Sequence, residues 1–133
     1  MHFELSHFTD YWRATAPADT GLNARLLLEF EQASLTPRKQ SHFFSGRYEN
    51  IYLAPHLLTS LPPLLAALRQ TATDILERPL RQSMTAHWFN RMQPGHITGL
   101  HTHDDEDELL SAVYYLKVPR HSAISFCIRL VKK

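Results

Sequence analysis

Two histidines that stand one residue apart are the residues of this sequence with the clearest chemical use. They are His101 and His103, in the segment GLHTHDDEDELLSAVYYLKVP at residues 99–119. Because successive side chains of a β-strand point to opposite faces, an H-x-H pair on a strand directs both imidazoles to the same face. Two imidazoles that converge in this way suit a borderline divalent metal ion. The spacing therefore predicts half of a metal site.

Five acidic residues follow the histidine pair directly, at positions 104–108. One interpretation is a solvated acidic loop between two strands. The other makes His103 and Asp105 an H-x-D pair, which offers an imidazole and a carboxylate to iron. We favour His103 as the partner of His101, because the two side chains share a face directly, and Asp105 stays the alternative second ligand.

A turn upstream of the histidines indicates which residues face them. Pro94–Gly95, in the stretch QPGH, suits the centre of a type II turn between two strands. With this turn at the tip of a hairpin, His101 lies opposite Trp88, and the period of two puts Asn90 on the same face. His87 then points to the other face and is not expected to be a ligand.

The elements that must position these residues begin with two predicted helices. Leucines and a phenylalanine recur at helical spacing in residues 22–30, and a longer stripe runs through residues 61–76. Thr59 or Ser60 can cap the start of the second helix, and Pro79 ends it. The stripe is expected to be packing surface. Its members are Leu61, Leu64, Leu65, Leu68, Ala72, Ile75 and Leu76.

Strand-forming residues dominate the second half of the chain, after a first candidate strand at residues 48–54. Helices followed by antiparallel strands indicate an α+β fold with the helices packed on one sheet. We therefore expect one domain over residues 1–133, with a helical front at 1–80 and a β-barrel part at 84–131. The later candidate strands lie at residues 84–92, 97–103, 109–118 and 123–131.

Composition limits the classes of function that are plausible. The chain has 133 residues, is 44% hydrophobic and carries a formal net charge of +1, which predicts no basic surface for nucleic acid. No apolar run approaches the length that crosses a bilayer, and the N-terminus lacks the features of a signal peptide. The single cysteine, Cys127, can form neither an internal disulfide nor a cysteine zinc site. We expect a reducing, cytoplasmic setting.

From about residue 46 to residue 119 the chain resembles the 2-oxoglutarate/Fe(II)-dependent oxygenases, especially a bacterial prolyl-hydroxylase-like group. The resemblance is carried by GRYENIYL, by WFNRMQPGHITGLHTHDDEDELLSAVYYLKVP and by the helix between them. It implies a double-stranded β-helix, also called a jelly-roll or cupin-like barrel, with helices packed on it. It also implies hydroxylation of a small-molecule or protein substrate, with succinate and CO2 as co-products.

The resemblance assigns roles to particular residues. His101 and His103 match the first two Fe(II) ligand positions. Tyr115 matches a residue that reaches toward 2-oxoglutarate in relatives, and Asn90 matches a polar position that faces the pocket. Cross-strand packing is the alternative role for Tyr115 and its neighbour Tyr114.

The end of the chain departs from the family pattern, which places a third, distal histidine and a 2-oxoglutarate-binding arginine several strands further on. His121 is expected to be a turn residue and Arg129 an exposed strand residue. We therefore expect a C-terminally truncated domain whose barrel lacks its closing strands and whose activity is impaired or absent. The open sheet edge would favour a homodimer, and the alternative function is a non-catalytic cupin-like module that binds a metal or a partner.

Overall fold

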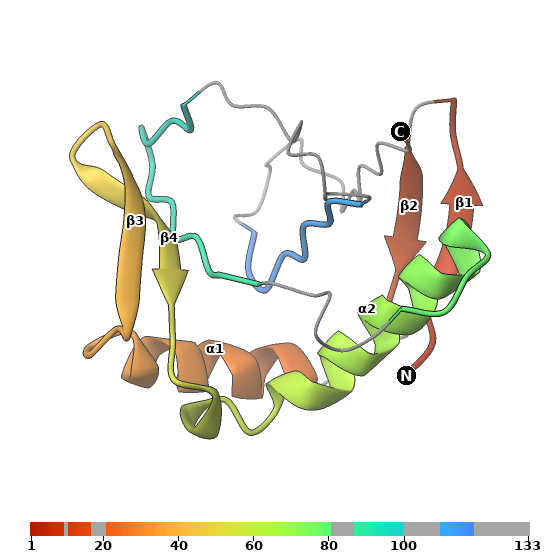
Figure 1. Cartoon of the computed structure of the whole chain (residues 1–133). Coiled ribbons are helices and arrows are strands. Elements are labelled where there is room, and N and C mark those ends of the chain that lie inside the picture. The colour runs from red at the N-terminus through yellow and green to blue at the C-terminus, as the bar shows by residue number, and fades with distance from the viewer. Residues whose placement is uncertain (10, 17–20, 81–86, 100–109, 119–133) are drawn as a thin grey trace.

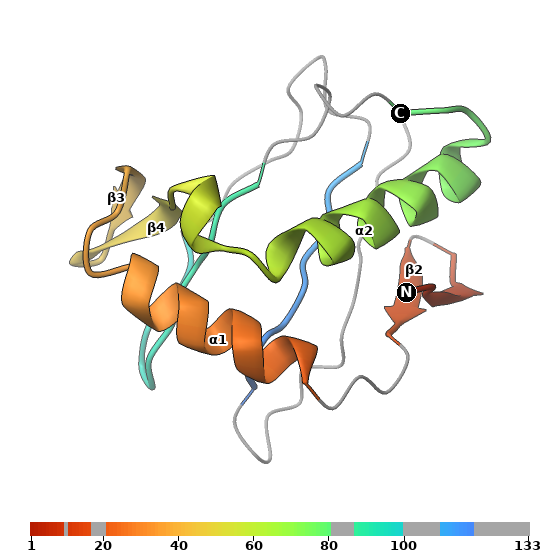
Figure 2. The same cartoon turned by 90° about the horizontal axis from the view of Figure 1, so that it is seen from below.

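Two helices and two small antiparallel sheets make up the computed structural model of this chain, so the predicted α+β class is confirmed. In Figure 1 the helices form one side of the molecule and the two hairpins stand at its ends. Seen from below, segment 110–118 runs behind α1 and α2 (Figure 2). The structure describes residues 1–9, 11–16, 21–80, 87–99 and 110–118.

Both predicted helices are present. Helix α1 spans Leu22–Ala33 and α2 spans Leu61–Leu76. The chain leaves α2 at Glu77, which adopts a left-handed conformation two residues before Pro79. Members of the predicted stripe do pack on the core, where Leu61 and Leu64 are buried, and Leu65, Leu68 and Ile75 are partly buried. Among the described residues, no helix has the length and apolar character needed to cross a membrane.

A carboxylate from α1 caps the start of α2. Ser60 is the N-cap residue, as predicted, but its hydroxyl makes no capping bond to the helix. Instead Ser60 N donates to Glu29 Oε2 at 3.0 Å, and the hydroxyls of Ser60 and Thr59 donate to Glu29 Oε1 at 2.9 and 2.7 Å. Glu29 therefore satisfies an amide that the helix start leaves unpaired, and it joins the two helices.

The Glu29 cap makes the stability of the fold sensitive to acid. Burial acts to raise the pKa of Glu29, but hydrogen bonds from Thr59 and Ser60 and the charge of Arg25 outweigh it, so this pKa lies below its ordinary value of 4.5. The stabilisation that the ionised Glu29 provides is complete above the unfolded pKa and is lost as the pH falls through the lower, folded pKa.

Glu29→Gln should lower the free energy of unfolding by about 1 kcal/mol at pH 7, the size of an N-cap deletion. Urea denaturation between pH 3 and pH 7 measures both effects, and Glu77→Gln at the other end of α2 is the matched control. An unchanged pH dependence in Glu29→Gln would contradict the assignment.

A tight hairpin extends beyond the predicted strand at residues 48–54. Strand β3, Lys39–Phe44, pairs with β4, Arg47–Tyr52, in an antiparallel register that sets Phe44 opposite Arg47. Ser45 and Gly46 connect them, with φ of 49° and 81°. Positive φ at both central positions is typical of the type I′ turn, whose twist matches that of the flanking strands. This hairpin places Arg47 and Glu49 in the first half of β4.

A second hairpin closes the other end of the molecule. Strand β1, Glu4–His7, pairs with β2, Trp12–Thr15. Ala14 of β2 and Phe3, the residue before β1, belong to a core shared with both helices. The buried hydrophobic residues are Phe3, Ala14, Leu22, Leu26, Phe30, Ala33, Leu53, Leu58, Leu61, Leu64 and Ala67.

The described strands form two separate two-stranded sheets, and no jelly-roll or closed barrel is present among the described residues. Two expectations about the arrangement need correction. The front of the chain, residues 1–80, is not only helical, because it contains all four named strands. Residues 110–118 of the predicted strand at 109–118 form no strand. Their apolar side chains instead pack on the helical core through Leu110, Tyr114 and Leu116, because a strand also needs a hydrogen-bonded neighbour.

Candidate functional site

The predicted ligands His101, His103 and Asp105 lie outside the described residues. The structure does describe the two segments that flank them, residues 87–99 and 110–118. The geometry of these segments determines where the chain leads into the candidate site and where it leaves.

The predicted turn before the histidines is present. His96 N donates to Gln93 O at 3.0 Å across Pro94–Gly95, and Gly95 has a φ of 83°. Proline followed by a residue with positive φ is the combination that a type II turn requires. The ring of His96 is used inside this turn, since its Nδ1 accepts a bond from Gln93 N at 3.0 Å.

Segment 87–99 is attached to β4 by a pair of backbone hydrogen bonds. Phe89 and Ile51 exchange N–H···O bonds of 2.8 Å in both directions. The ring of Phe89 lies 5.2 Å from that of Phe30 on α1, which connects this bridge to the core. His87 and Phe89 line one hollow of the surface, and Trp88 and Asn90 are not among the residues that line it.

Arg47 of β4 holds the two arms of the turn together. Its Nη1 donates to Asn90 Oδ1 at 2.7 Å and to Arg91 O at 3.3 Å, before the turn. Its Nη2 donates to Ile97 O at 3.4 Å, after the turn. The Arg47 side chain is only 11% exposed, so solvent screens these bonds less than those of a surface arginine. Asn90, the predicted pocket residue, is itself exposed and is oriented by this arginine.

Glu49 extends the same network to Gly99, two positions before the candidate ligand His101. Its Oε1 lies 3.5 Å from Arg47 Nη2 and accepts a bond from Gly99 N at 3.1 Å. A Cβ at Gly99 would lie 3.2 Å from the ring of Phe44, so the glycine permits a close approach to β3. Arg47 and Glu49 were not predicted as site residues. Their alternation on a strand, inside GRYENIYL, is the signal that could have identified them.

Replacing Arg47 by lysine should loosen the attachment of residues 89–99. Lysine keeps the charge but cannot reproduce the planar fork that contacts both arms, so we expect the free energy of unfolding to fall by about 2 kcal/mol. Hydrogen exchange at the amides of Phe89 and Gly99 should become faster. Arg78→Lys makes the same change at an exposed position and should alter neither quantity. Undiminished protection of both amides in Arg47→Lys would show that the fork is dispensable.

The two adjacent tyrosines after the candidate ligands differ in environment. Tyr114 donates its hydroxyl to Asn23 Oδ1 of α1 at 2.5 Å, and its ring meets that of Phe3 edge-on at 6.4 Å. Packing is therefore the role of Tyr114. Tyr115 is half-buried beside it, and its predicted contact with 2-oxoglutarate stays a prediction.

Within the described ranges, no three histidine, cysteine or acidic side chains are grouped closely enough to hold a metal ion. The sequence matches no protein-family model, and no curated protein or solved structure matches it. A function for this chain is therefore inferred from its own residues and their arrangement.

Proposed function

We propose that this chain is a 2-oxoglutarate- and Fe(II)-dependent dioxygenase-type domain that works in a reducing, cytoplasmic setting. The observation that carries the proposal is the His-Thr-His-Asp stretch in its sequence context, a few residues after the Pro94–Gly95 turn. Its support from the described residues is the network of Arg47 and Glu49, which attaches residues 89–99 to β4 and positions the backbone at Gly99. A scaffold that holds the approach to the ligands is what a site with exacting geometry needs.

The same attachment supports the finer fold proposal. Strand β4 and the segment around Phe89 are joined by two backbone hydrogen bonds. We propose that they are neighbouring strands of one layer of a double-stranded β-helix that residues after Gly99 extend. The paired strand β3 would lie on the other side of β4 in that layer.

The donor set fits the metal by its chemistry. Imidazole nitrogens from His101 and His103, with Asp105 as the alternative second ligand, suit Fe(II), which takes two histidines and a carboxylate or a third histidine in this class of site. When bound, iron and 2-oxoglutarate would activate O2, the oxidant for hydroxylation, and 2-oxoglutarate would be oxidised to succinate and CO2. The protein's own part would be to bind the co-substrate, with Tyr115 and Asn90 as the residues assigned to it, and to exclude water.

The test is a two-stage measurement on the purified full chain. Fe(II) and 2-oxoglutarate are added without oxygen, and the weak visible charge-transfer band is recorded. Oxygen is then admitted and succinate is quantified. The proposal expects the band and at least slow succinate formation, both absent in His101→Ala. His96→Ala, a histidine of the turn, is the control and should retain both. A chain with neither band nor succinate would contradict the proposal.

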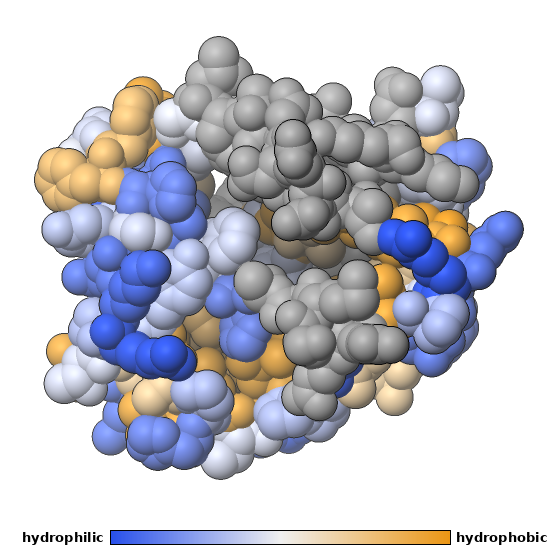
Figure 3. All heavy atoms as spheres, in the orientation of Figure 1, coloured by the Kyte–Doolittle hydropathy of each residue, from blue (hydrophilic) through white to orange (hydrophobic). Residues whose placement is uncertain are grey.

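A second candidate is a non-catalytic cupin-like module that binds a metal or a partner, including a second copy of the chain. It is favoured by exposed aromatic side chains around the β3–β4 turn, where Phe43 and Tyr48 are 66% and 42% exposed. Figure 3 shows hydrophobic surface at this end of the molecule. Strand β3 pairs only with β4 among the described residues. Light scattering that finds a stable dimer, together with iron binding but no succinate, would favour this module over the oxygenase.

A further inference from the structure

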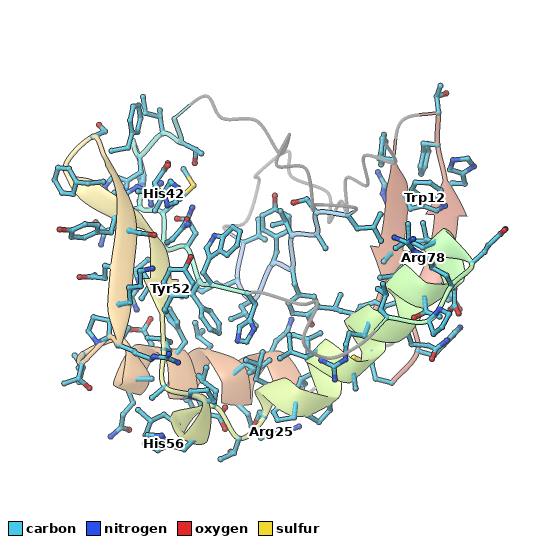
Figure 4. All side chains as sticks on the ribbon, in the orientation of Figure 1. Trp12, Arg25, His42, Tyr52, His56 and Arg78 are labelled. Atoms are coloured by element: carbon cyan, nitrogen blue, oxygen red, sulfur yellow. The ribbon has the colours of Figure 1, made fainter. Side chains whose placement is uncertain are left out.

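A hollow of about 310 Å³ lies where β3 begins and β4 ends. It is built by non-local pairing, since Lys39 of β3 is opposite Tyr52 of β4 and Arg38 N donates to Tyr52 O at 2.9 Å. The bridge between Ile51 and Phe89 brings a third segment to the same place. Figure 4 shows Tyr52 on β4, at the opposite end of the molecule from Arg78.

One side of this hollow is basic. Arg38, Lys39 and His87 all line it, and none of the described residues that line it is acidic. Lys39 Nζ lies 5.3 Å from the centre of the Tyr52 ring, which orients the ammonium group at the edge of the hollow. Two permanent positive charges, with no carboxylate among the described lining residues, create a potential that attracts an anion. Burial also lowers the pKa of His87 below its ordinary value.

The other side of the hollow is apolar. Leu53 is buried in the core, Pro55 begins the short 3-10 helix, and Phe89 packs on Phe30. Because Leu53 and Phe89 are held by the core, this side is preformed and needs no reorganisation to accept a ligand. A volume of about 310 Å³ is at the lower end of small-molecule sites. A basic side facing an apolar side selects a ligand that has both a negative group and an apolar body.

We propose that this hollow binds a small organic anion, with a carboxylate or phosphate held by Arg38 and Lys39 and an apolar body against Leu53 and Phe89. Arg38 supplies a planar donor fork that matches either acid group, and Lys39 supplies a point charge. The site uses none of the residues assigned to iron or 2-oxoglutarate. Its binding can therefore be measured without either of them.

Isothermal titration of the full chain at low ionic strength tests the proposal, with benzoate and phenyl phosphate as the anionic probes and benzyl alcohol as the neutral one. We expect an anion to bind, and the double variant Arg38→Gln/Lys39→Gln to weaken it at least about tenfold, the loss of one or two charge-assisted bonds. The tighter of the two anions identifies the acid group. Arg78→Gln removes one positive charge elsewhere and should change nothing.

Two results would overturn the proposal. One is benzyl alcohol binding as tightly as the anions, which would make the charges irrelevant. The other is an affinity in Arg38→Gln/Lys39→Gln equal to that of the unmodified chain. Should the double variant lose its native circular dichroism, the single variants Arg38→Gln and Lys39→Gln serve in its place. Wild-type affinity in both single variants would equally overturn the assignment.

Discussion

Replacing His101 or His103 by alanine is expected to weaken Fe(II) binding by more than about 10–100-fold, the loss already seen when only an outer-shell residue of a metal site is removed. Each histidine is proposed to bind the ion directly through an imidazole nitrogen, so the loss of either should weaken Fe(II) binding. Succinate formation should fall below detection in both variants. Anaerobic titration with Fe(II), followed by the charge-transfer band with 2-oxoglutarate, measures the effect.

A parallel variant decides between the two candidate second ligands. If His103 is the ligand, Asp105→Ala should bind Fe(II) nearly as the unmodified chain does, because Asp105 then belongs to the acidic loop. If Asp105 rather than His103 is the second ligand, Asp105→Ala should weaken Fe(II) binding and His103→Ala should leave it nearly unchanged. His96→Ala is the control in both cases, since the ring of His96 already bonds to the backbone of its own turn. Wild-type Fe(II) affinity in His101→Ala would refute the proposed metal centre.

Replacing Leu26 by alanine is expected to cost about 3 kcal/mol of the free energy of unfolding, within the range of about 2–5 kcal/mol for a buried leucine. Leu26 is 0% exposed at the centre of the core, on the face of α1 that also carries Leu22 and Phe30. The packing of Phe89 on Phe30 lies next to this position in the core cluster, so the cavity should also loosen segment 87–99. Urea denaturation gives the first quantity, and hydrogen exchange at the Phe89 amide gives the second.

Leu28→Ala provides the matched control on the same helix. Leu28 is 72% exposed, so removing its side chain should change the stability by less than about 0.5 kcal/mol. Alanine is also the best helix former, which offsets any small loss of contact. Equal destabilisation by the two substitutions would mean that α1 presents a different face to the core.

Local patterns in the sequence were sufficient to predict several secondary-structure elements. The leucine spacing predicted both helices. Pro79 was predicted to end the second helix, and α2 ends at Leu76, just before it. The strand at residues 48–54 corresponds to β4, and Pro94–Gly95 forms the predicted turn. These features depend on side-chain periodicity or on the φ preferences of one or two residues. Such preferences act over a few positions and can therefore be read from the chain directly.

Long-range pairing could not be predicted in the same way. The hairpin of β1 and β2 was missed, because its residues show no clear alternation of buried and exposed side chains. Residues 110–118 have strand-forming composition but pack on the helices, where Tyr114 reaches Asn23. Composition favours an extended backbone, whereas a strand needs a neighbour at the correct distance and register.

By itself, then, the sequence determined the α+β class, the two helices, the turn before the histidines and the donor types available for a metal. Only the tertiary structure decided that Glu29 caps α2, that Arg47 and Glu49 attach residues 89–99 to β4, and that Arg38 and Lys39 face the hollow beside His87 and Phe89. Each of these contacts joins residues at least 30 positions apart. Their formation depends on packing of the whole core, because no local preference brings such residues together.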